Sequence, residues 1–453
     1  MSGALRTWWS LVRHTHGRGG RLPTVLAVTA FAVTTWSVLT VAGGVQAFAA
    51  RAQLPGAGPD AETYPLLSWV SVALLLVPTA TLGAAAARLT VARRDERLAR
   101  LRLAGATSTQ IGVVALLDAA VQAVAGAGLG VVLDLVALPA VARLRFQGRA
   151  FEVAELRLGA GPVLGTVAAV LLVALVSSAV SLRRVAITPL GVAQRLPQRG
   201  LSWARVVPVL VLGVGFVAAF NAGSLVFGAG VVVGALVLVG FLAGAFAVFN
   251  LVGPLLVSLL GRVLSARARS VPTLLAARRM SEDPKSTWRS VGGVSLVTFV
   301  AGCLSVTPRL TAGAPAGGEA QLMSDIGTGA AVTLVIAAVL AAVSTGVTQA
   351  SRVLDSRDRY RTLHLSGTDV AVLHAARSRE TWIPLVVTMG GAAALALLIV
   401  SPVLGLLGSA PVGVLWFVAC AGAGAGLVLL AARASRPLVE AAAAGDATGI
   451  PSR

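Results

Sequence analysis

The chain has 453 residues, of which 56% are hydrophobic and only 12% are charged, and its mean hydropathy is +0.85. These values exclude an ordinary water-soluble protein and indicate an integral membrane protein. The formal net charge of +19 is spread over short segments between apolar runs. Such a distribution is typical of membrane topology and of contact with anionic lipid headgroups, and it argues against nucleic acid as a partner.

About ten apolar runs follow one another along the chain, each near the ~20 residues that cross the hydrocarbon core as a helix. The sequence therefore predicts an all-α integral membrane fold with about ten transmembrane helices. Between the fifth and sixth spans the only polar break is Asn221–Ser224, which must form a tight turn outside the membrane. The predicted spans are 24–47, 66–87, 111–141, 162–182, 205–220, 225–249, 290–307, 326–350, 380–401 and 412–432.

Positive charge predicts the orientation of the chain. Of the 37 Lys and Arg residues, 31 fall in segments on one side of the ten-span layout, namely 1–23, 88–110, 183–205, 262–289, 351–379 and 433–453. The positive-inside rule places these segments, and with them both termini, in the cytoplasm. The first apolar run is about twice the usual length of a signal sequence, so we expect an uncleaved first helix. The arginine-, alanine- and glycine-rich composition favours a bacterial plasma membrane.

An arginine-rich stretch occurs twice at equivalent places. Residues 94–107 read RDERLARLRLAGAT, and residues 356–369, which lie 262 positions further on, read SRDRYRTLHLSGTD. Each stretch follows one predicted span and precedes another, and each ends a short helical pattern at a glycine, Gly105 or Gly367. In the first copy, Thr107 or Ser108 can cap the helix that enters the membrane.

The elements around these stretches also recur in the same order, which predicts an internal duplication. Each repeat is preceded by a cytoplasmic segment that leads into its first span, which we call an elbow. The second elbow should contain an interfacial amphipathic helix at Thr273–Met280, which Pro284 should stop. The predicted units are an N-terminal cytoplasmic elbow at 1–23, a first four-span repeat at 24–182, a two-span linker region at 183–260, a cytoplasmic elbow at 261–289, a second four-span repeat at 290–432 and a cytoplasmic tail at 433–453.

With these motifs the chain resembles the FtsX-like permease family, the membrane subunits of ABC transporters of the MacB and lipoprotein-releasing types. The recurring sequence motif of the family is a charged stretch followed by Leu/Ile-Ala-x-Leu-Arg-x-x-Gly-Ala-Thr/Ser, and Leu98–Thr107 matches this motif. Tyr360–Gly367 matches it more loosely, and Arg97 and Arg359 stand where the family usually has a glutamate. The layout looks like that of bacitracin-efflux-type permeases, although only about 18 residues occupy the place of their large outside domain.

The resemblance implies that both stretches are coupling helices, which sit in a groove on a separate ATP-binding subunit and pass its motion to the spans. Leucines among arginines at the cytosolic boundary are suited to docking in such a groove, because they present apolar side chains surrounded by cations. The alternative is a plain stop-transfer loop, which two copies at matching positions disfavour. The coupling residues would be Arg97, Leu98, Arg100, Leu101, Arg102, Leu103 and Gly105 in the first copy, and Arg359, Tyr360, Arg361, Leu363, His364, Leu365 and Gly367 in the second.

The chain lacks the phosphate-binding loop of an ATPase, because its only lysine, Lys285, does not follow the required glycines. We therefore expect no enzymatic activity and no catalytic, cofactor or metal residues in this chain. ATP and Mg²⁺ should be bound by a partner, an ABC nucleotide-binding subunit, with two copies per chain to match the two stretches. Other expected partners are membrane lipid and either a sensor kinase or a further membrane subunit.

Three acidic residues, Asp118, Asp134 and Glu380, fall inside predicted spans, where charge is costly. Asp118 and Glu380 are again 262 residues apart, and they either bond to neighbouring helices or line a route for a cationic or amphipathic substrate. Structural bonding is the favoured hypothesis, and Arg377 is one helical step from Glu380 and able to neutralise it. Asp134, nearer the outside end, is expected to line the route or to lie close to a loop.

Two functions are compatible with these features. The first is a permease subunit of an ABC transporter, which couples ATP hydrolysis by its partner to export or extraction of an amphipathic substrate. The alternative is a membrane protein that relays the motion of the ATPase to another protein and transports nothing. The short outside loops weaken the alternative, because a relay needs something to hold outside the membrane.

Overall fold

The protein is described here by a computed structural model, which covers residues 21–55, 61–92, 107–186, 231–304, 318–355 and 369–407, with single residues at 207, 211, 214, 215 and 422. The elbow before residue 21 and the tail at 433–453 lie outside the described residues, as do the spans predicted at 205–220 and 412–432 apart from those single positions.

The described part of the chain is α-helical apart from one small hairpin. Six of its helices, α2, α3, α5, α7, α14 and α16, are long and apolar enough to cross a membrane. The prediction of an all-α membrane protein is confirmed to that extent, and the number of ten spans stays a prediction. The long helices are α2 (Arg21–Ala52), α3 (Thr63–Ala92), α5 (Ser108–Ala142), α7 (Ala160–Ala186), α10 (Val231–Arg267), α12 (Pro284–Leu304), α14 (Gly318–Asp355) and α16 (Val370–Leu407).

Two helix boundaries follow the sequence signals closely. Helix α5 begins with a capping box, in which the Thr107 hydroxyl accepts the Gln110 amide and the Gln110 side chain accepts the Thr107 amide. The short helix α11 (Val271–Glu282) ends two residues before Pro284, which is the first residue of α12. Of the two predicted capping residues, Thr107 is the cap and Ser108 is the first residue of the helix, and the predicted stop before Pro284 is confirmed.

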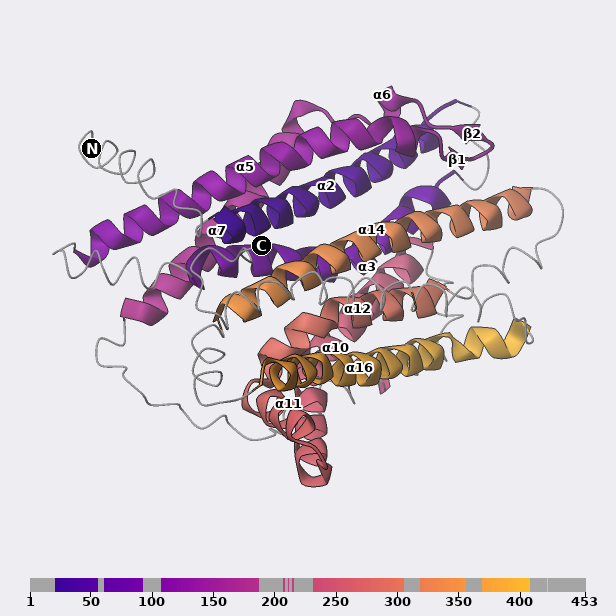
Figure 1. Cartoon of the computed structure of the whole chain (residues 1–453). Helices are drawn as coiled ribbons and strands as arrows, with labels where there is room; N and C mark the ends of the chain where they lie inside the picture. The colour runs from indigo at the N-terminus through magenta and orange to yellow at the C-terminus, as the bar shows by residue number, and fades with distance from the viewer. Residues whose placement is uncertain are drawn as a thin grey trace.

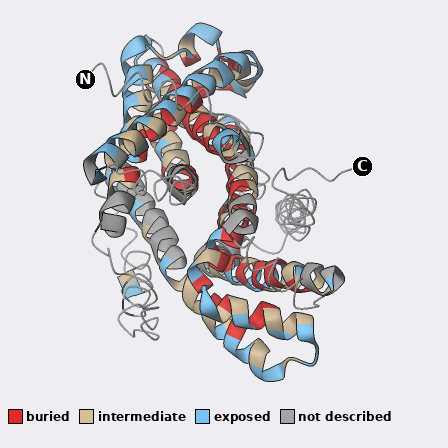
Figure 2. Ribbon diagram, turned by 60° about the vertical axis from the view of Figure 1, so that its left-hand side comes forward, coloured by how far each residue is buried: buried red, intermediate tan, exposed pale blue. Residues whose placement is uncertain are grey.

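The helices form an elongated bundle with the hairpin at one end and α11 at the other (Figure 1). Helix α2 packs between α3 and α5, α7 covers α5 and α3, and α3 packs on α14. On the other side of that contact, α12 lies between α14 and α16, while α10 contacts α3, α11 and α12. Buried residues lie where helices meet, and exposed residues lie along the outer faces of the bundle (Figure 2). Such apolar outer faces are suited to lipid.

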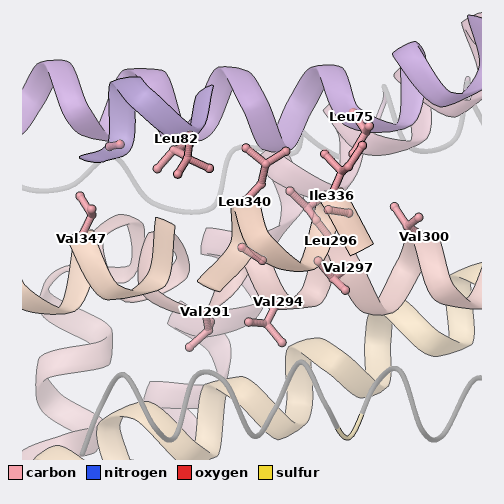
Figure 3. Close-up of a cluster of buried hydrophobic side chains, with 14 of the residues drawn as sticks. Leu75, Leu82, Val291, Val294, Leu296, Val297, Val300, Ile336, Leu340 and Val347 are labelled. Carbon is pink, nitrogen blue, oxygen red and sulfur yellow. The ribbon is translucent and has the colours of Figure 1, made fainter. Parts of the chain in front are cut away.

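The main core joins the early helices to the late ones. Leu82 of α3 and Leu340 of α14 are fully buried in the seam between these two helices, and Leu296 of α12 is nearly so (Figure 3). Between α12 and α16, the hydroxyls of Ser295 and Thr388 lie 2.8 Å apart. Small polar side chains of this kind link helices in a membrane, where no water can satisfy them.

Helix α5 approaches α2 closely at two of its glycines. A Cβ added at Gly130 would lie 2.5 Å from the Ala32 carbonyl oxygen, and one at Gly126 would lie 2.5 Å from the Phe31 Cβ. Gly128, which is on the other face of α5, has nothing within 4 Å of such a Cβ. The glycines at 126 and 130 therefore allow α2 and α5 to pack as one unit.

Candidate functional site

The two arginine-rich stretches lie outside the described residues, but the helices that flank them are described. The first stretch connects the end of α3 to the start of α5, and the second connects the end of α14 to the start of α16. The predicted coupling residues from Arg97 to Gly105 and from Arg359 to Gly367 thus receive no structural description.

The flanking helices place both connections at the same end of the bundle. Helices α3 and α14 run parallel, because Tyr64 contacts Asp325 near their starts and Ser71 contacts Thr333 further along both helices. Their ends, and the starts of α5 and α16, lie at the end of the bundle opposite the hairpin (Figure 1). Both arginine-rich stretches therefore join helices at one end.

Glu380 fastens α16 to the elbow helix α11. Its side chain is 6% exposed, and the Arg279 guanidinium of α11 donates to its carboxylate at 3.4 Å. The adjacent Arg379 donates to the hydroxyls of Ser270 and Thr273 at 2.6 and 2.7 Å, at the start of α11. This geometry fits structural bonding, one of the two roles considered for Glu380, and its cation Arg279 was not anticipated from the sequence.

The two aspartates of α5 lie apart from each other and from Glu380. Asp118 is half-buried near the start of the helix, and Asp134 is half-buried four to five turns further on. The Thr40 hydroxyl of α2 donates to the Asp134 carboxylate at 2.9 Å. The three predicted acids are therefore not brought together into one site.

Residues 143–158 fold into a small structure that we call the cap. It consists of strands β1 (Arg145–Phe146) and β2 (Arg149–Ala150) and the single-turn helix α6 (Val153–Leu156). Gln147 and Gly148 between the strands have φ values of 57° and 76°, the left-handed pair that a two-residue hairpin turn of type I′ requires. Phe146, Phe151 and Leu156 are buried against the end of α2.

A buried arginine holds the cap on α2. The Arg51 side chain is 2% exposed and pairs with Glu155 at 2.6 Å. The same guanidinium donates to the carbonyl oxygens of Phe146 at 3.1 Å and Ala150 at 2.9 Å, and it lies 4.2 Å from the centre of the Phe151 ring. One side chain thus contacts both strands and α6 of the cap.

Glu155 depends on this arrangement for its charge. Burial raises the pKa of its carboxyl, but hydrogen bonds from Arg51 and from the Glu152 amide, with the charges of Arg51 and Arg149, lower that pKa below its usual value. The ionised form of Glu155 is therefore the form that the folded cap stabilises.

Asp325 links the cap to both halves of the bundle. Asp325 is 4% exposed, and its carboxylate accepts hydrogen bonds from the Tyr64 hydroxyl of α3 and the Gln147 backbone amide of the cap, both at 2.7 Å. The Gln321 side chain, one turn earlier on α14, donates at 3.1 Å. Three separate elements thus meet at one buried carboxylate.

A cavity of about 180 Å³ lies under the cap, between α2, α3 and α14. Its wall is mainly apolar, and Asp325 and Tyr64 lie in it near the cap, with Ser71 and Thr333 deeper between the helices. The other lining residues include Thr40, Val41, Val45, Phe48, Leu67, Ser68, Leu74, Leu75, Leu144, Phe146, Phe151, Leu156, Ile326, Ile336 and the backbone around Gly44 and Gly329.

Sequence reasoning missed the residues that build this cavity. The region 143–161 is one of the short outside loops in the ten-span layout, for which the sequence predicts no folded domain, and Asp325 lies one residue before the predicted span at 326–350. The dipeptide Gln147-Gly148 between Phe146 and Phe151 was the available signal for a hairpin turn. Within the described residues, no group of three His, Cys, Asp or Glu side chains is arranged to hold a metal ion.

Comparison with known proteins gave no match among family models, curated proteins or solved structures.

Proposed function

We propose that this chain is the membrane subunit of an ATP-driven transporter and that a separate ATPase docks on its two arginine-rich stretches. The observation that carries the proposal is the common placement of the flanking helices. The ends of α3 and α14 and the starts of α5 and α16 share one end of the bundle. Two stretches of the same character on the same side of the membrane can engage the two halves of one ATPase pair.

The proposed fold behind this function is a duplication with a 262-residue offset. Ser71 and Thr333, whose side-chain oxygens are 2.8 Å apart across the seam between α3 and α14, are separated by that offset. The first residues of α5 and α16, Ser108 and Val370, are separated by it as well. Equivalent residues that contact each other are expected on the axis of an approximate two-fold relation. FtsX-like repeats would have this property.

The side of the membrane follows from charge. The arginine-rich stretches belong to the set of segments that hold 31 of the 37 Lys and Arg residues. We therefore assign the end of the bundle with these stretches to the cytoplasm of a bacterium and the cap to the outside. ATP and Mg²⁺ would be bound by the partner, since this chain has no phosphate-binding loop.

The cavity favours transport over a pure relay of motion. It lies at the end opposite the arginine-rich stretches, and it is bounded by α3 and α14, which lead to those stretches. An apolar cavity with a few polar groups is suited to an amphipathic molecule. A relay that only moved another protein would not require such a cavity.

Purification of the tagged chain from its own host membrane tests the proposal. An ATPase with a phosphate-binding loop should copurify, at two ATPase copies per chain, and its ATP hydrolysis should rise in the complex. Replacing Leu101 and Leu103, or Leu363 and Leu365, with Asp should abolish that rise and leave insertion intact, because charge is unfavourable in an apolar groove.

The matched control replaces the same leucines with Met, which keeps the apolar contact. Unchanged stimulation in the Asp variants would refute docking at these stretches. Stimulated hydrolysis without any transported compound would favour the relay instead.

A further inference from the structure

The cavity has an aromatic wall on the side of the cap. The Phe48 ring lies 5.6 Å from Tyr64, 5.2 Å from Phe146 and 5.3 Å from Phe151, measured between ring centres. All four residues line the cavity. The faces of aromatic rings carry negative potential, so a group of rings around a cavity favours a cation, and most of all an alkylated ammonium.

The same wall contains the Asp325 carboxylate, which forms no ion pair with the residues that the structure describes. Within the part of the chain that the structure describes, the hydrogen-bond donors to Asp325 are a hydroxyl, a backbone amide and a side-chain amide, all neutral. A buried carboxylate is costly unless a positive charge is near. Its two oxygens offer about four lone pairs, and the three donors leave room for one more.

The volume limits what can enter. An apolar cavity of about 150 Å³ accommodates a benzene molecule, so the ~180 Å³ under the cap suits one ring or a short alkyl chain with a small head. A folded peptide or a large macrocycle does not fit in this conformation.

We propose that this cavity is a binding site for a hydrophobic ammonium compound. The ring or alkyl chain lies against Leu74, Leu75 and Ile336, and the ammonium group lies between the aromatic rings and Asp325. The proposal deepens the proposed transport function, on which its physiological meaning rests, by naming the chemical class of the substrate. Binding itself needs only this chain, so the site and the coupling to an ATPase fail or succeed separately.

Equilibrium dialysis of radiolabelled benzylamine, protonated at pH 7, tests the site. The full chain is placed in nanodiscs of phosphatidylglycerol, which has no ammonium headgroup, and binding to empty nanodiscs is subtracted. Asp325→Asn should weaken benzylamine binding at least about tenfold, because a buried cation loses its charged partner. Asp118→Asn is the matched control, since it removes the same charge from α5 outside the cavity wall, and it should bind as the wild type does.

A neutral competitor separates charge recognition from simple hydrophobic filling. Ethylbenzene has nearly the shape of benzylamine without the charge. It should displace labelled benzylamine poorly from the wild-type chain. Equal displacement by ethylbenzene and unlabelled benzylamine, or wild-type affinity in Asp325→Asn, would overturn the proposal.

Phe48→Leu keeps the test decisive if Asp325→Asn fails to fold. This variant leaves the carboxylate and its hydrogen bonds in place and removes the central ring of the group. Benzylamine binding should weaken about two- to fivefold, the effect of one cation–π contact, and unchanged binding would contradict the aromatic site.

The source of the ammonium group is decided by a second nanodisc composition. If a third of the lipid is phosphatidylethanolamine and the affinity for benzylamine falls, the site takes a lipid headgroup. If the affinity is unchanged, the site takes a free organic cation.

Discussion

Replacing Arg51 with Met should release the cap from α2. Methionine keeps most of the apolar stem of arginine and removes all five donors. The Glu155 carboxylate would lose its buried cation at 2.6 Å and keep the exposed Arg149 at 3.3 Å, and the carbonyl oxygens of Phe146 and Ala150 would lose the donor that Arg51 provides.

The size of the effect follows from burial. The Arg51 side chain is 2% exposed, and removing one partner of a buried ion pair costs about 3–5 kcal/mol. Since each ~1.4 kcal/mol is a factor of ten, opening of the cap should become roughly 100- to 4,000-fold more frequent. Amide hydrogen exchange across residues 145–156 measures this directly, because amides there exchange when the cap opens.

Arg149→Met is the matched control. Arg149 contacts the same Glu155 carboxylate at 3.3 Å, but its side chain is 52% exposed, and exposed pairs contribute at most about 1 kcal/mol. Exchange should therefore rise less than about sixfold in that variant. Equal protection in Arg51→Met and the wild type, or equal losses in the two variants, would refute the argument that burial of Arg51 holds the cap.

Three further results are expected. Gly130→Val should lower the melting temperature in detergent, because its Cβ would meet the backbone of α2, whereas Gly128→Val, which meets nothing within 4 Å, should not. Because the pKa of Glu155 is lowered in the folded cap, its contribution to cap stability is present above the usual glutamate pKa of about 4.3 and is lost as the pH falls through the lower folded value. Corrected exchange rates should rise in that acidic range in the wild type and show no such rise in Glu155→Gln. Asp118→Asn should leave transport unchanged if this residue only bonds to its surroundings, and a loss of transport at normal expression would assign it to the pathway.

The helices of the bundle were predictable because a membrane imposes a simple rule. Every backbone polar group must be satisfied within a spanning segment, so long apolar runs become helices and their ends fall near polar or capping residues. The α5 cap at Thr107 and the break at Pro284 were found for this reason. The partners of single polar side chains were not predictable, and Arg279 is an example, since it lies 101 residues from Glu380.

The cap and the cavity were missed for a related reason. A hairpin with two residues in each strand has too few positions for an alternating pattern to stand out. Its stability comes from Arg51 and Asp325, which are 95 and 178 residues from their partners Phe146 and Gln147. Only the three-dimensional packing of α2, α3 and α14 brings these groups to the same end.

We expect the contact between α3 and α14 to be the one that changes during transport, with the two helices moving relative to each other. Helix α3 has 30 residues and is about 45 Å long, so a displacement at the end that leads to the first arginine-rich stretch reaches the cavity only if the helix moves as a body. Near the cavity, the polar contacts of the seam include Tyr64 with Asp325 and Ser71 with Thr333, and hydrogen bonds of this kind contribute about 1 kcal/mol each. Between α2 and α5, by contrast, the backbone of α5 at Gly126 and Gly130 lies so close to α2 that it leaves no room for a Cβ, and we expect this tightly packed pair to be the stiffer unit. A disulfide between Ser71→Cys and Thr333→Cys should therefore stop transport and leave docking of the ATPase intact, and reduction should restore transport. Full transport with the disulfide formed would show that the cavity opens elsewhere.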